Sequence, residues 1–136
     1  MKNKALFLDR DGVLNKLVDN RPPWHKSEVI FYSAAKSILQ IAISKNFLPI
    51  VVTNQPDAGR GKLSYENLHS INRFICEHLQ IKLFYICDHP FDNICECRKP
   101  KPGMLLKASS ENNIDLSESF LIGDREKDIQ AGINAG

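Results

Sequence analysis

Four short apolar runs, each followed within two residues by a polar or metal-binding side chain, constrain the fold of this chain more than any other feature. Runs of three to five apolar residues are too short for buried helices, and they are typical of strands covered on both faces of a sheet. The runs and the residues that follow them are Ala5–Leu8 before Asp9, Leu48–Val52 before Thr53, Leu83–Ile86 before Cys87, and Phe120–Ile122 before Gly123 and Asp124.

Amphipathic helical patterns separate these runs. An alternation of buried strands and helices predicts a single α/β domain over residues 1–136, with a Rossmann-like parallel sheet covered by helices on both faces. In such sheets ligands bind at the carboxyl ends of the strands, so we expect Asp9, Thr53 and Asp124 to share one edge. The predicted helices are 33–45 with Ser33 as N-cap, 64–79 with Ser64 as N-cap, a helix that opens at Pro102 and Gly103, and 127–135.

The composition gives no reason to expect nucleic acid or a membrane surface as a partner. The 18 lysine and arginine residues nearly balance the 16 aspartate and glutamate residues, and a formal net charge of +2 does not suggest nucleic acid or a membrane surface. No apolar run approaches the ~20 residues of a membrane span, and the N-terminal residues lack the features of a signal peptide. We therefore interpret the protein as cytoplasmic, a location in which clustered cysteines are more often metal ligands than disulfides.

Two carboxylates separated by one residue form a candidate cation site. In an extended chain Asp9 and Asp11 point to the same side, so they repel each other unless a cation bridges them or one takes a proton. Mg²⁺ prefers such hard oxygen ligands. Asp124 would supply a further oxygen from another strand end, and Asp128 would help to hold the site from the last helix. A cation here would let an anionic nucleophile approach a phosphate, which predicts phosphoryl chemistry at this edge.

A second cluster of ligating side chains follows the third predicted strand. Three thiols and one imidazole lie within eleven positions, which is typical of a tetrahedral Cys₃His zinc site. Four protein ligands leave no open position on the metal, so we expect this Zn²⁺ to be structural and to fix the loop that precedes the Arg-Lys pair at 98–99. The predicted ligands are Cys87, His89, Cys95 and Cys97.

The polar motifs together resemble those of the haloacid dehalogenase superfamily. The segment 9–15 (Asp-Arg-Asp-Gly-Val-Leu-Asn) resembles its first motif, 53–55 (Thr-Asn-Gln) its second, and 123–128 (Gly-Asp-Arg-Glu-Lys-Asp) its fourth. The third motif of the superfamily is a lysine, which either Lys99 or Lys101 supplies. The resemblance covers nearly the whole chain.

The resemblance implies a magnesium-dependent phosphatase. Asp9 would attack phosphorus and form an aspartyl-phosphate, and Asp11 would protonate the leaving oxygen and then activate water. An aspartate in the second position suits a phosphatase, because an ester leaving group needs a proton. Mg²⁺ would be held by the carboxylates of Asp9 and Asp124 and by the backbone carbonyl of Asp11.

Other matching residues would bind the phosphorylated substrate. The resemblance implies that Thr53 and Asn54 hydrogen-bond the phosphoryl oxygens and that Lys99 offsets negative charge there. Three arginines are further candidates for contact with a small-molecule substrate: Arg98, Arg60 and Arg125.

Within the superfamily, the loop that carries the predicted zinc ligands (residues 87–97, the thiol loop) and residues 97–104 resemble the heptose bisphosphate phosphatase and histidinol-phosphatase group. This implies a small sugar phosphate as substrate, D-glycero-D-manno-heptose 1,7-bisphosphate in particular, a precursor of lipopolysaccharide that would lose its anomeric phosphate. Arg98 would then contact a second phosphate or a sugar hydroxyl. The short spacer in the thiol loop favours histidinol-phosphate phosphatase instead, and an alternative of another class is a non-catalytic module that binds a phosphorylated sugar.

The spacing of the motifs leaves no room for an inserted cap domain, so we expect an open pocket lined by loops. The chain ends directly after the predicted helix 127–135, where members of this superfamily usually add another strand. We therefore expect Phe120–Ile122 to be an edge strand and the protein to be a monomer or a weak homodimer.

Overall fold

A parallel sheet of four strands in the order β3-β2-β1-β4 forms the centre of the computed structural model, which describes all 136 residues. Every strand pairing in it is parallel, as the buried apolar runs predict. The strands are β1 (Lys4–Leu8), β2 (Phe47–Asn54), β3 (Leu83–Cys87) and β4 (Phe120–Ile122).

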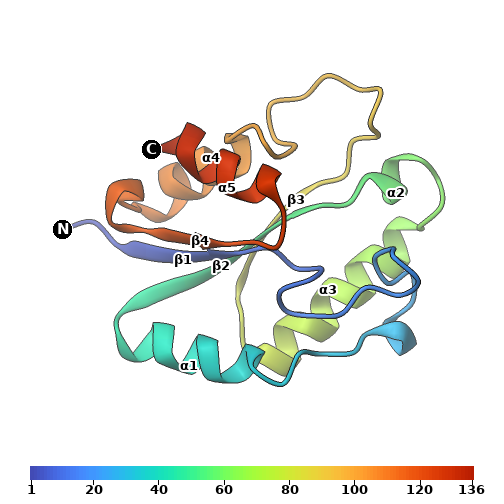
Figure 1. Ribbon diagram of the computed structural model, residues 1–136, viewed down its shortest axis with the longest axis horizontal. Coiled ribbons are helices and arrows are strands. Elements are labelled where there is room, and N and C mark those ends of the chain that lie inside the picture. Colours follow the sequence, from blue (N-terminus) through green and yellow to red (C-terminus); the bar gives the residue numbers. More distant parts are fainter.

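Helices cover both faces of this sheet (Figure 1), so the predicted fold class is confirmed. α1 and α3 lie on one face, and α4 and α5 lie on the other. No helix combines the length and apolar character that crossing a bilayer requires. The helices are α1 (Ala35–Ser44), α2 (Pro56–Gly59), α3 (Tyr65–Leu79), α4 (Gly103–Asn112) and α5 (Glu126–Ala135), with short 3₁₀ turns at Lys26–Glu28 and Leu116–Glu118.

β1 shows why the strands consist of continuous apolar residues. Leu6 and Leu8 belong to the core between the sheet and α1 and α3, whereas Ala5 and Phe7 belong to the core beneath α4 and α5. Successive side chains of a strand point to opposite faces, so both sets must be apolar when both faces are covered. The strand ends at Leu8, and the next residue, Asp9, lies at the polar edge of the sheet.

The sequence predicts the start of α3 correctly and the start of α1 incorrectly. Ser64 is the N-cap of α3, where its hydroxyl accepts a hydrogen bond from the backbone N–H of Asn67 at 3.1 Å. The prediction of Ser33 as the N-cap of α1 is wrong, because Ala34 occupies that position and makes no side-chain cap. The chain enters α1 through a backbone turn instead, in which the N–H of Ala35 donates to the carbonyl of Tyr32 at 3.1 Å.

One element at the edge of the sheet was predicted, and one short helix was not. β4 is an edge strand, as predicted, and Phe120 exposes 64% of its surface there. The four-residue helix α2 directly follows β2 and was not predicted, because one turn of helix shows no periodicity in the sequence. Pro56 at its start, where a missing N–H costs nothing, is the only local signal for it.

Candidate active site and metal centres

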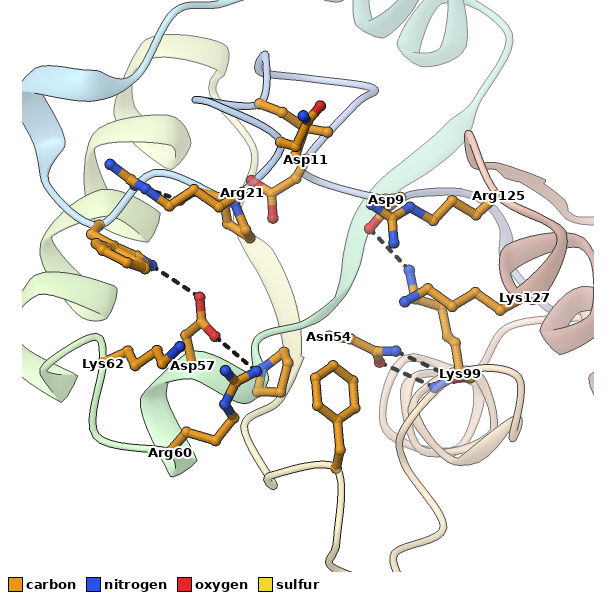
Figure 2. A pocket seen from close by; sticks show the side chains of 16 residues that line it. Asp9, Asp11, Arg21, Asn54, Asp57, Arg60, Lys62, Lys99, Arg125 and Lys127 are labelled. Atoms are coloured by element: carbon orange, nitrogen blue, oxygen red, sulfur yellow. Dashed lines mark hydrogen bonds and ion pairs between the residues drawn. The ribbon is translucent and has the colours of Figure 1, made fainter.

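Asp9, Asp11 and Asn54, at the carboxyl ends of β1 and β2, line one pocket of about 330 Å³, within the range for small-molecule sites, whereas Thr53 and Asp124 are not part of its lining (Figure 2). Asp9, Lys99, Arg125 and Lys127 lie on one side of this pocket, and Arg21, Asp57, Arg60 and Lys62 lie on the other. Its lining residues are Asp9, Asp11, Leu17, Asn20, Arg21, Pro22, Trp24, Asn54, Pro56, Asp57, Arg60, Lys62, Phe91, Lys99, Arg125 and Lys127.

Lys99 is the buried cation of this site. Its ammonium nitrogen lies 2.9 Å from Asp9 Oδ1 and 2.5 Å from Asp128 Oδ1, and it also donates to the carbonyl of Val52 at 3.0 Å. Lys99 is 4% exposed, whereas the ammonium of Lys101 is solvent-accessible and lies 3.4 Å from Glu96. Of the two lysines that fit the motif, only Lys99 therefore reaches the carboxylates at the strand ends.

Asn54 holds the loop that carries this lysine. Its side-chain oxygen accepts the backbone N–H of Lys99 at 3.1 Å, and its amide nitrogen donates to the carbonyl of Lys99 at 3.3 Å. Asn54 also lines the pocket, but its two amide atoms bind the backbone of Lys99. Thr53 is buried and its hydroxyl oxygen accepts a hydrogen bond from Gln55 at 2.9 Å.

Three carboxylates form a group whose oxygens lie within 4.8 Å of one another: Asp9, Asp124 and Asp128. Hard oxygen donors at this spacing fit a cation such as Mg²⁺. Gly12 permits the approach of Asp124, because a Cβ on Gly12 would lie 2.0 Å from Asp124 Oδ2 and its φ is +89°. The side chain of Asp11 lies outside this group, which leaves its backbone carbonyl as the atom that the resemblance assigns to the metal.

Asp9 is in an environment that disfavours its charge in the absence of a metal. Burial raises the pKa of Asp9 from 3.8 to about 6, the attraction of Lys99 opposes this shift, and repulsion from Asp128 and Asp11 adds to it. The carboxylate is therefore held at the sheet edge at some cost to the free energy of folding, and a bound cation would offset that cost.

This raised pKa predicts a pH-dependent stability difference between the wild type and Asp9→Asn in metal-free protein. Because the pKa of Asp9 is higher in the folded state than in the unfolded state, its protonation contributes to the free energy of unfolding. This contribution is complete below about pH 4 and is lost as the pH rises through 6. We expect Asp9→Asn in EDTA to be about 3 kcal/mol more stable than the wild type above pH 7, and nearly equally stable near pH 4. Chemical denaturation at a series of pH values measures this, and a difference that does not change with pH would contradict it.

A loop between β1 and α1 closes one wall of the pocket. The indole N–H of Trp24 donates to Asp57 Oδ2 at 2.9 Å, which ties this loop to α2. The guanidinium of Arg21 stacks on the Trp24 ring at 3.9 Å and binds both oxygens of Glu28, at 3.2 and 2.6 Å. The pKa of Glu28 is lowered to about 2, chiefly by the hydrogen bonds from Arg21. Residues of this loop therefore form one wall of the pocket.

The three arginines predicted to bind substrate differ in their positions. Arg60 and Arg125 line the pocket, and Arg60 also lies 3.4 Å from Asp57 and above the ring of Phe91. Arg98 is absent from the pocket lining, since its guanidinium donates to the carbonyls of Pro90 and Asn93 at 2.9 and 2.8 Å. The structure thus gives Arg98 a role in holding the thiol loop.

The pocket carries an excess of positive charge. Burial lowers the pKa of Lys127, and the neighbouring charges of Arg125 and Lys99 lower it further. Such a concentration of cations suits an anionic ligand like a phosphate. Six basic side chains line the pocket, namely Arg21, Arg60, Lys62, Lys99, Arg125 and Lys127, against three acidic ones, namely Asp9, Asp11 and Asp57.

The predicted zinc ligands also come together. The ligand atoms of Cys87, His89, Cys95 and Cys97 all lie within 4.8 Å of one another, with His89 Nδ1 3.4 Å from Cys87 Sγ and 3.2 Å from Cys97 Sγ. Burial raises the pKa of Cys87. For Cys95, burial is outweighed by hydrogen bonds from the backbone of Arg98 and from the neighbouring thiols, which lower its pKa to about 7. A Cys₃His group this tight fits a tetrahedral metal ion.

Comparison with known proteins identifies the family of the chain. A D-glycero-β-D-manno-heptose-1,7-bisphosphate 7-phosphatase of Helicobacter pylori is 37% identical over 139 residues, which span 98% of this chain and 79% of that relative. A D-glycero-α-D-manno-heptose-1,7-bisphosphate 7-phosphatase of Burkholderia mallei is 38% identical over 148 residues, spanning 100% of this chain and 77% of that one.

A solved structure and a family model agree with these relatives. D,D-heptose 1,7-bisphosphate phosphatase from B. bronchiseptica, crystallised with magnesium and phosphate, superposes with a TM-score of 0.89 at 28% identity, covering 98% of this chain and 76% of that one. Residues 96–136 match a family model described as HAD-hydrolase-like.

The chain belongs to the haloacid dehalogenase superfamily of hydrolases, and within it to the phosphatases that these heptose bisphosphate relatives represent. The prediction that it is a phosphoric monoester hydrolase is confirmed.

Several residues in or near the pocket were assigned no role by sequence reasoning. Asp57, Lys62 and Lys127 line the pocket, yet none of them was assigned a role, although Lys127 lies within the motif at 123–128. Gln55 lies two residues after Thr53, and an i, i+2 spacing beyond a strand end places both side chains on one side, a signal that would have found it.

Proposed function

We propose that this protein is a magnesium-dependent phosphatase that removes the 7-phosphate of a D-glycero-D-manno-heptose 1,7-bisphosphate. The observation that carries the proposal is the arrangement in which the buried Lys99 holds Asp9 and Asp128, with the exposed Asp124 beside them, at the carboxyl edge of the sheet. The relatives are named as 7-phosphatases, so this position replaces the anomeric phosphate expected from the sequence.

Asp9 acts as the nucleophile in this proposal. Its Oδ atom bonds to phosphorus while the bond from phosphorus to the leaving sugar oxygen breaks, and Asp11 gives its proton to that oxygen. A water then attacks the aspartyl-phosphate and loses its proton to the Asp11 carboxylate, which releases phosphate and restores both side chains. Lys99 keeps Asp9 in place, because its ammonium group binds Asp9 and Asp128 together.

Mg²⁺ held by Asp9, Asp124 and the backbone carbonyl of Asp11 would neutralise charge on the transferring phosphoryl group. The basic side chains of the pocket would bind the rest of the substrate. Arg60 and Lys62 lie on the wall opposite Asp9, so they are the cations that we assign to the far end of a bisphosphate (Figure 2).

Phosphate release from a panel of phosphate esters tests this function. The panel contains both anomers of the heptose 1,7-bisphosphate, fructose 1,6-bisphosphate, glucose 6-phosphate and histidinol phosphate, each assayed with and without Mg²⁺. We expect turnover of a heptose bisphosphate with loss of the C7 phosphate, identified by ³¹P NMR of the product. Preferred turnover of histidinol phosphate, or no turnover of any ester with Mg²⁺, would overturn the proposed substrate or the proposed activity respectively.

We further propose that the cysteine and histidine cluster binds one structural Zn²⁺ per chain. Structural zinc sites contribute directly to the free energy of folding. We therefore expect Cys95→Ser to lose the metal and to unfold at a temperature lower by about 5 °C or more, which corresponds to about 1 kcal/mol or more. Metal analysis and calorimetry measure both quantities.

Cys76→Ser is the matched control, because Cys76 lies in α3 outside the cluster. It should keep a full equivalent of zinc. A freshly purified, folded wild type with no zinc would contradict the assignment.

A further inference from the structure

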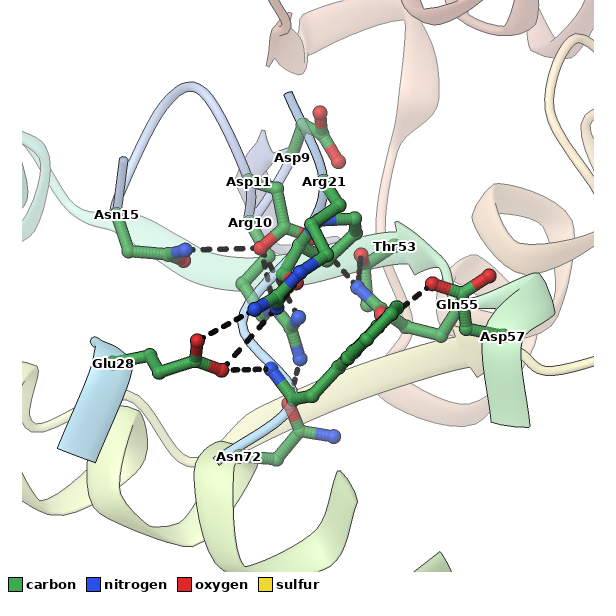
Figure 3. Close-up of polar contacts among 12 residues, drawn as sticks. Asp9, Arg10, Asp11, Asn15, Arg21, Glu28, Thr53, Gln55, Asp57 and Asn72 are labelled. Carbon is green, nitrogen blue, oxygen red and sulfur yellow. Dashed lines mark hydrogen bonds and ion pairs between the residues drawn. The ribbon is translucent and has the colours of Figure 1, made fainter. Parts of the chain in front are cut away.

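The carboxylate of Asp11 is enclosed by donor nitrogens from three side chains (Figure 3). Asp11 Oδ1 receives Arg10 Nε at 3.1 Å and Asn15 Nδ2 at 2.9 Å, and it also lies 3.0 Å from Arg10 Nη2. Asp11 Oδ2 receives only Gln55 Nε2, at 2.6 Å. The two oxygens of this carboxylate are therefore not equivalent.

This difference indicates which oxygen can exchange a proton. A carboxylate oxygen has about two lone-pair positions for hydrogen bonds. Oδ1 already faces three donor nitrogens, whereas Oδ2 faces one and keeps a free position. The orientation of Oδ2 rests on a single neighbour, Gln55.

Two of the three donor side chains, Arg10 and Gln55, are themselves held by further hydrogen bonds. Arg10 is fully buried, and its Nη1 donates to Asn72 Oδ1 on α3 at 2.8 Å. Gln55 is also fully buried, with its Nε2 donating to Thr53 Oγ1 at 2.9 Å and its backbone N–H donating to the carbonyl of Cys87 at 2.7 Å. Asp11 is thus connected to α3 on one side and to β2 and β3 on the other.

This cluster is poorly suited to stability alone. Asn15 Oδ1, Gln55 Oε1 and Asn72 Nδ2 are buried atoms without a protein partner, and Arg10 Nη2 has only its contact with Asp11. A buried polar atom without a partner costs free energy, so an apolar packing of the same volume would be more stable. All four of these atoms belong to the residues that donate to Asp11 or that hold such a donor.

We propose that Gln55 is a positioning residue that fixes Asp11 Oδ2 as the proton-exchanging atom, while Arg10, held by Asn72, locks Oδ1. The proposal rests on the proposed role of Asp11 as the acid and base. Arg10, Gln55 and Asn72 do not line the pocket, so they act through Asp11 and not through the substrate. The proton passes from Asp11 Oδ2 to the leaving oxygen as its bond to phosphorus breaks, and Oδ2 later takes a proton from the attacking water.

Leaving-group dependence tests this role. An alkyl oxygen of a sugar needs a proton to leave, whereas the p-nitrophenolate of p-nitrophenyl phosphate does not. The parameter kcat/KM reports only steps up to departure of the leaving group, so it isolates the acid step from the later hydrolysis. We expect Gln55→Met, which keeps the side-chain length but removes the donor, to lower kcat/KM for the heptose bisphosphate about 30-fold and for p-nitrophenyl phosphate less than about 3-fold.

Asp11→Asn provides the reference and separates two failures. It should show the same selectivity with a larger loss on the sugar substrate. If Asp11→Asn affects both substrates equally, the proposed acid role fails. If Asp11→Asn is selective but Gln55→Met lowers both substrates equally, Gln55 is merely structural and the further inference is overturned.

A pair of variants at Asn72 keeps the test decisive should Gln55→Met melt below the assay temperature. Asn72→Leu removes the acceptor for Arg10 Nη1, and Asn72→Asp retains one. We expect about a tenfold selective loss on the sugar substrate for Asn72→Leu and less than about a threefold loss for Asn72→Asp. Equal activity of these two variants, or an equal loss on both substrates, would contradict the proposal.

Discussion

Replacing Asp9 by Asn is expected to lower kcat for phosphate release by roughly four orders of magnitude while the chain stays folded. The amide has almost the same size as the carboxylate but is a poor nucleophile, so the bond to phosphorus cannot form. It also removes one oxygen from the group of carboxylates that includes Asp124 and Asp128. Single-turnover and steady-state phosphate release with saturating Mg²⁺ measure the loss.

Asp115→Asn is the matched control for this substitution. Asp115 is absent from the pocket lining and caps a 3₁₀ turn through its side-chain oxygen, which an asparagine can also do. The kcat of Asp115→Asn should equal that of the wild type. Activity of Asp9→Asn within tenfold of the wild type would remove Asp9 from the role of nucleophile.

The same substitution links function to stability. Metal-free Asp9→Asn is expected to be the more stable protein above pH 7, because burial disfavours the charge of Asp9 in the wild type. An activity that falls while stability rises cannot result from partial unfolding. The two measurements together therefore assign the loss to the chemistry of one carboxylate.

The strand-end residues were predictable because a parallel sheet with both faces covered leaves few ways to arrange them. Continuous apolar runs require burial on both faces, and parallel pairing then brings the carboxyl ends together. This is why Asp9 and Asp124, more than a hundred residues apart, share one group of carboxylates. The thiol cluster was predictable for a different reason, since its four ligands lie close in sequence.

The remaining parts of the site depend on contacts that no pattern encodes. The contact of Trp24 with Asp57 joins two loops, and Arg98 binds carbonyl oxygens, which every residue possesses. Asn54 matches a motif that implies phosphate binding, yet its side chain binds the backbone of Lys99. Residue type alone could not separate these roles, because an arginine or an asparagine donates equally well to a substrate or to the chain.

Lys99→Met is expected to lower kcat by about three orders of magnitude and also to destabilise the fold by about 3 kcal/mol at neutral pH. Methionine retains the length of the side chain but leaves Asp9 and Asp128 buried without their counter-ion. Removing one partner of a buried ion pair is costly, because the other charge stays out of water. Steady-state kinetics and chemical denaturation in EDTA measure the two effects.

The loss of stability should depend on pH with a definite sign. Lys99 opposes the upward shift of the Asp9 pKa, so its removal lets that pKa rise further and makes the ionised form harder to keep. The destabilisation of Lys99→Met should therefore be largest above pH 7 and should shrink toward pH 4, where Asp9 takes up a proton. Lys101→Met, two residues along the same loop, removes an exposed ammonium group 3.4 Å from Glu96 and should change neither property. If both substitutions had a similar effect, this loop would need positive charge in general. An effect confined to Lys99 assigns both the activity and the stability to the one ammonium group that binds Asp9 and Asp128 together.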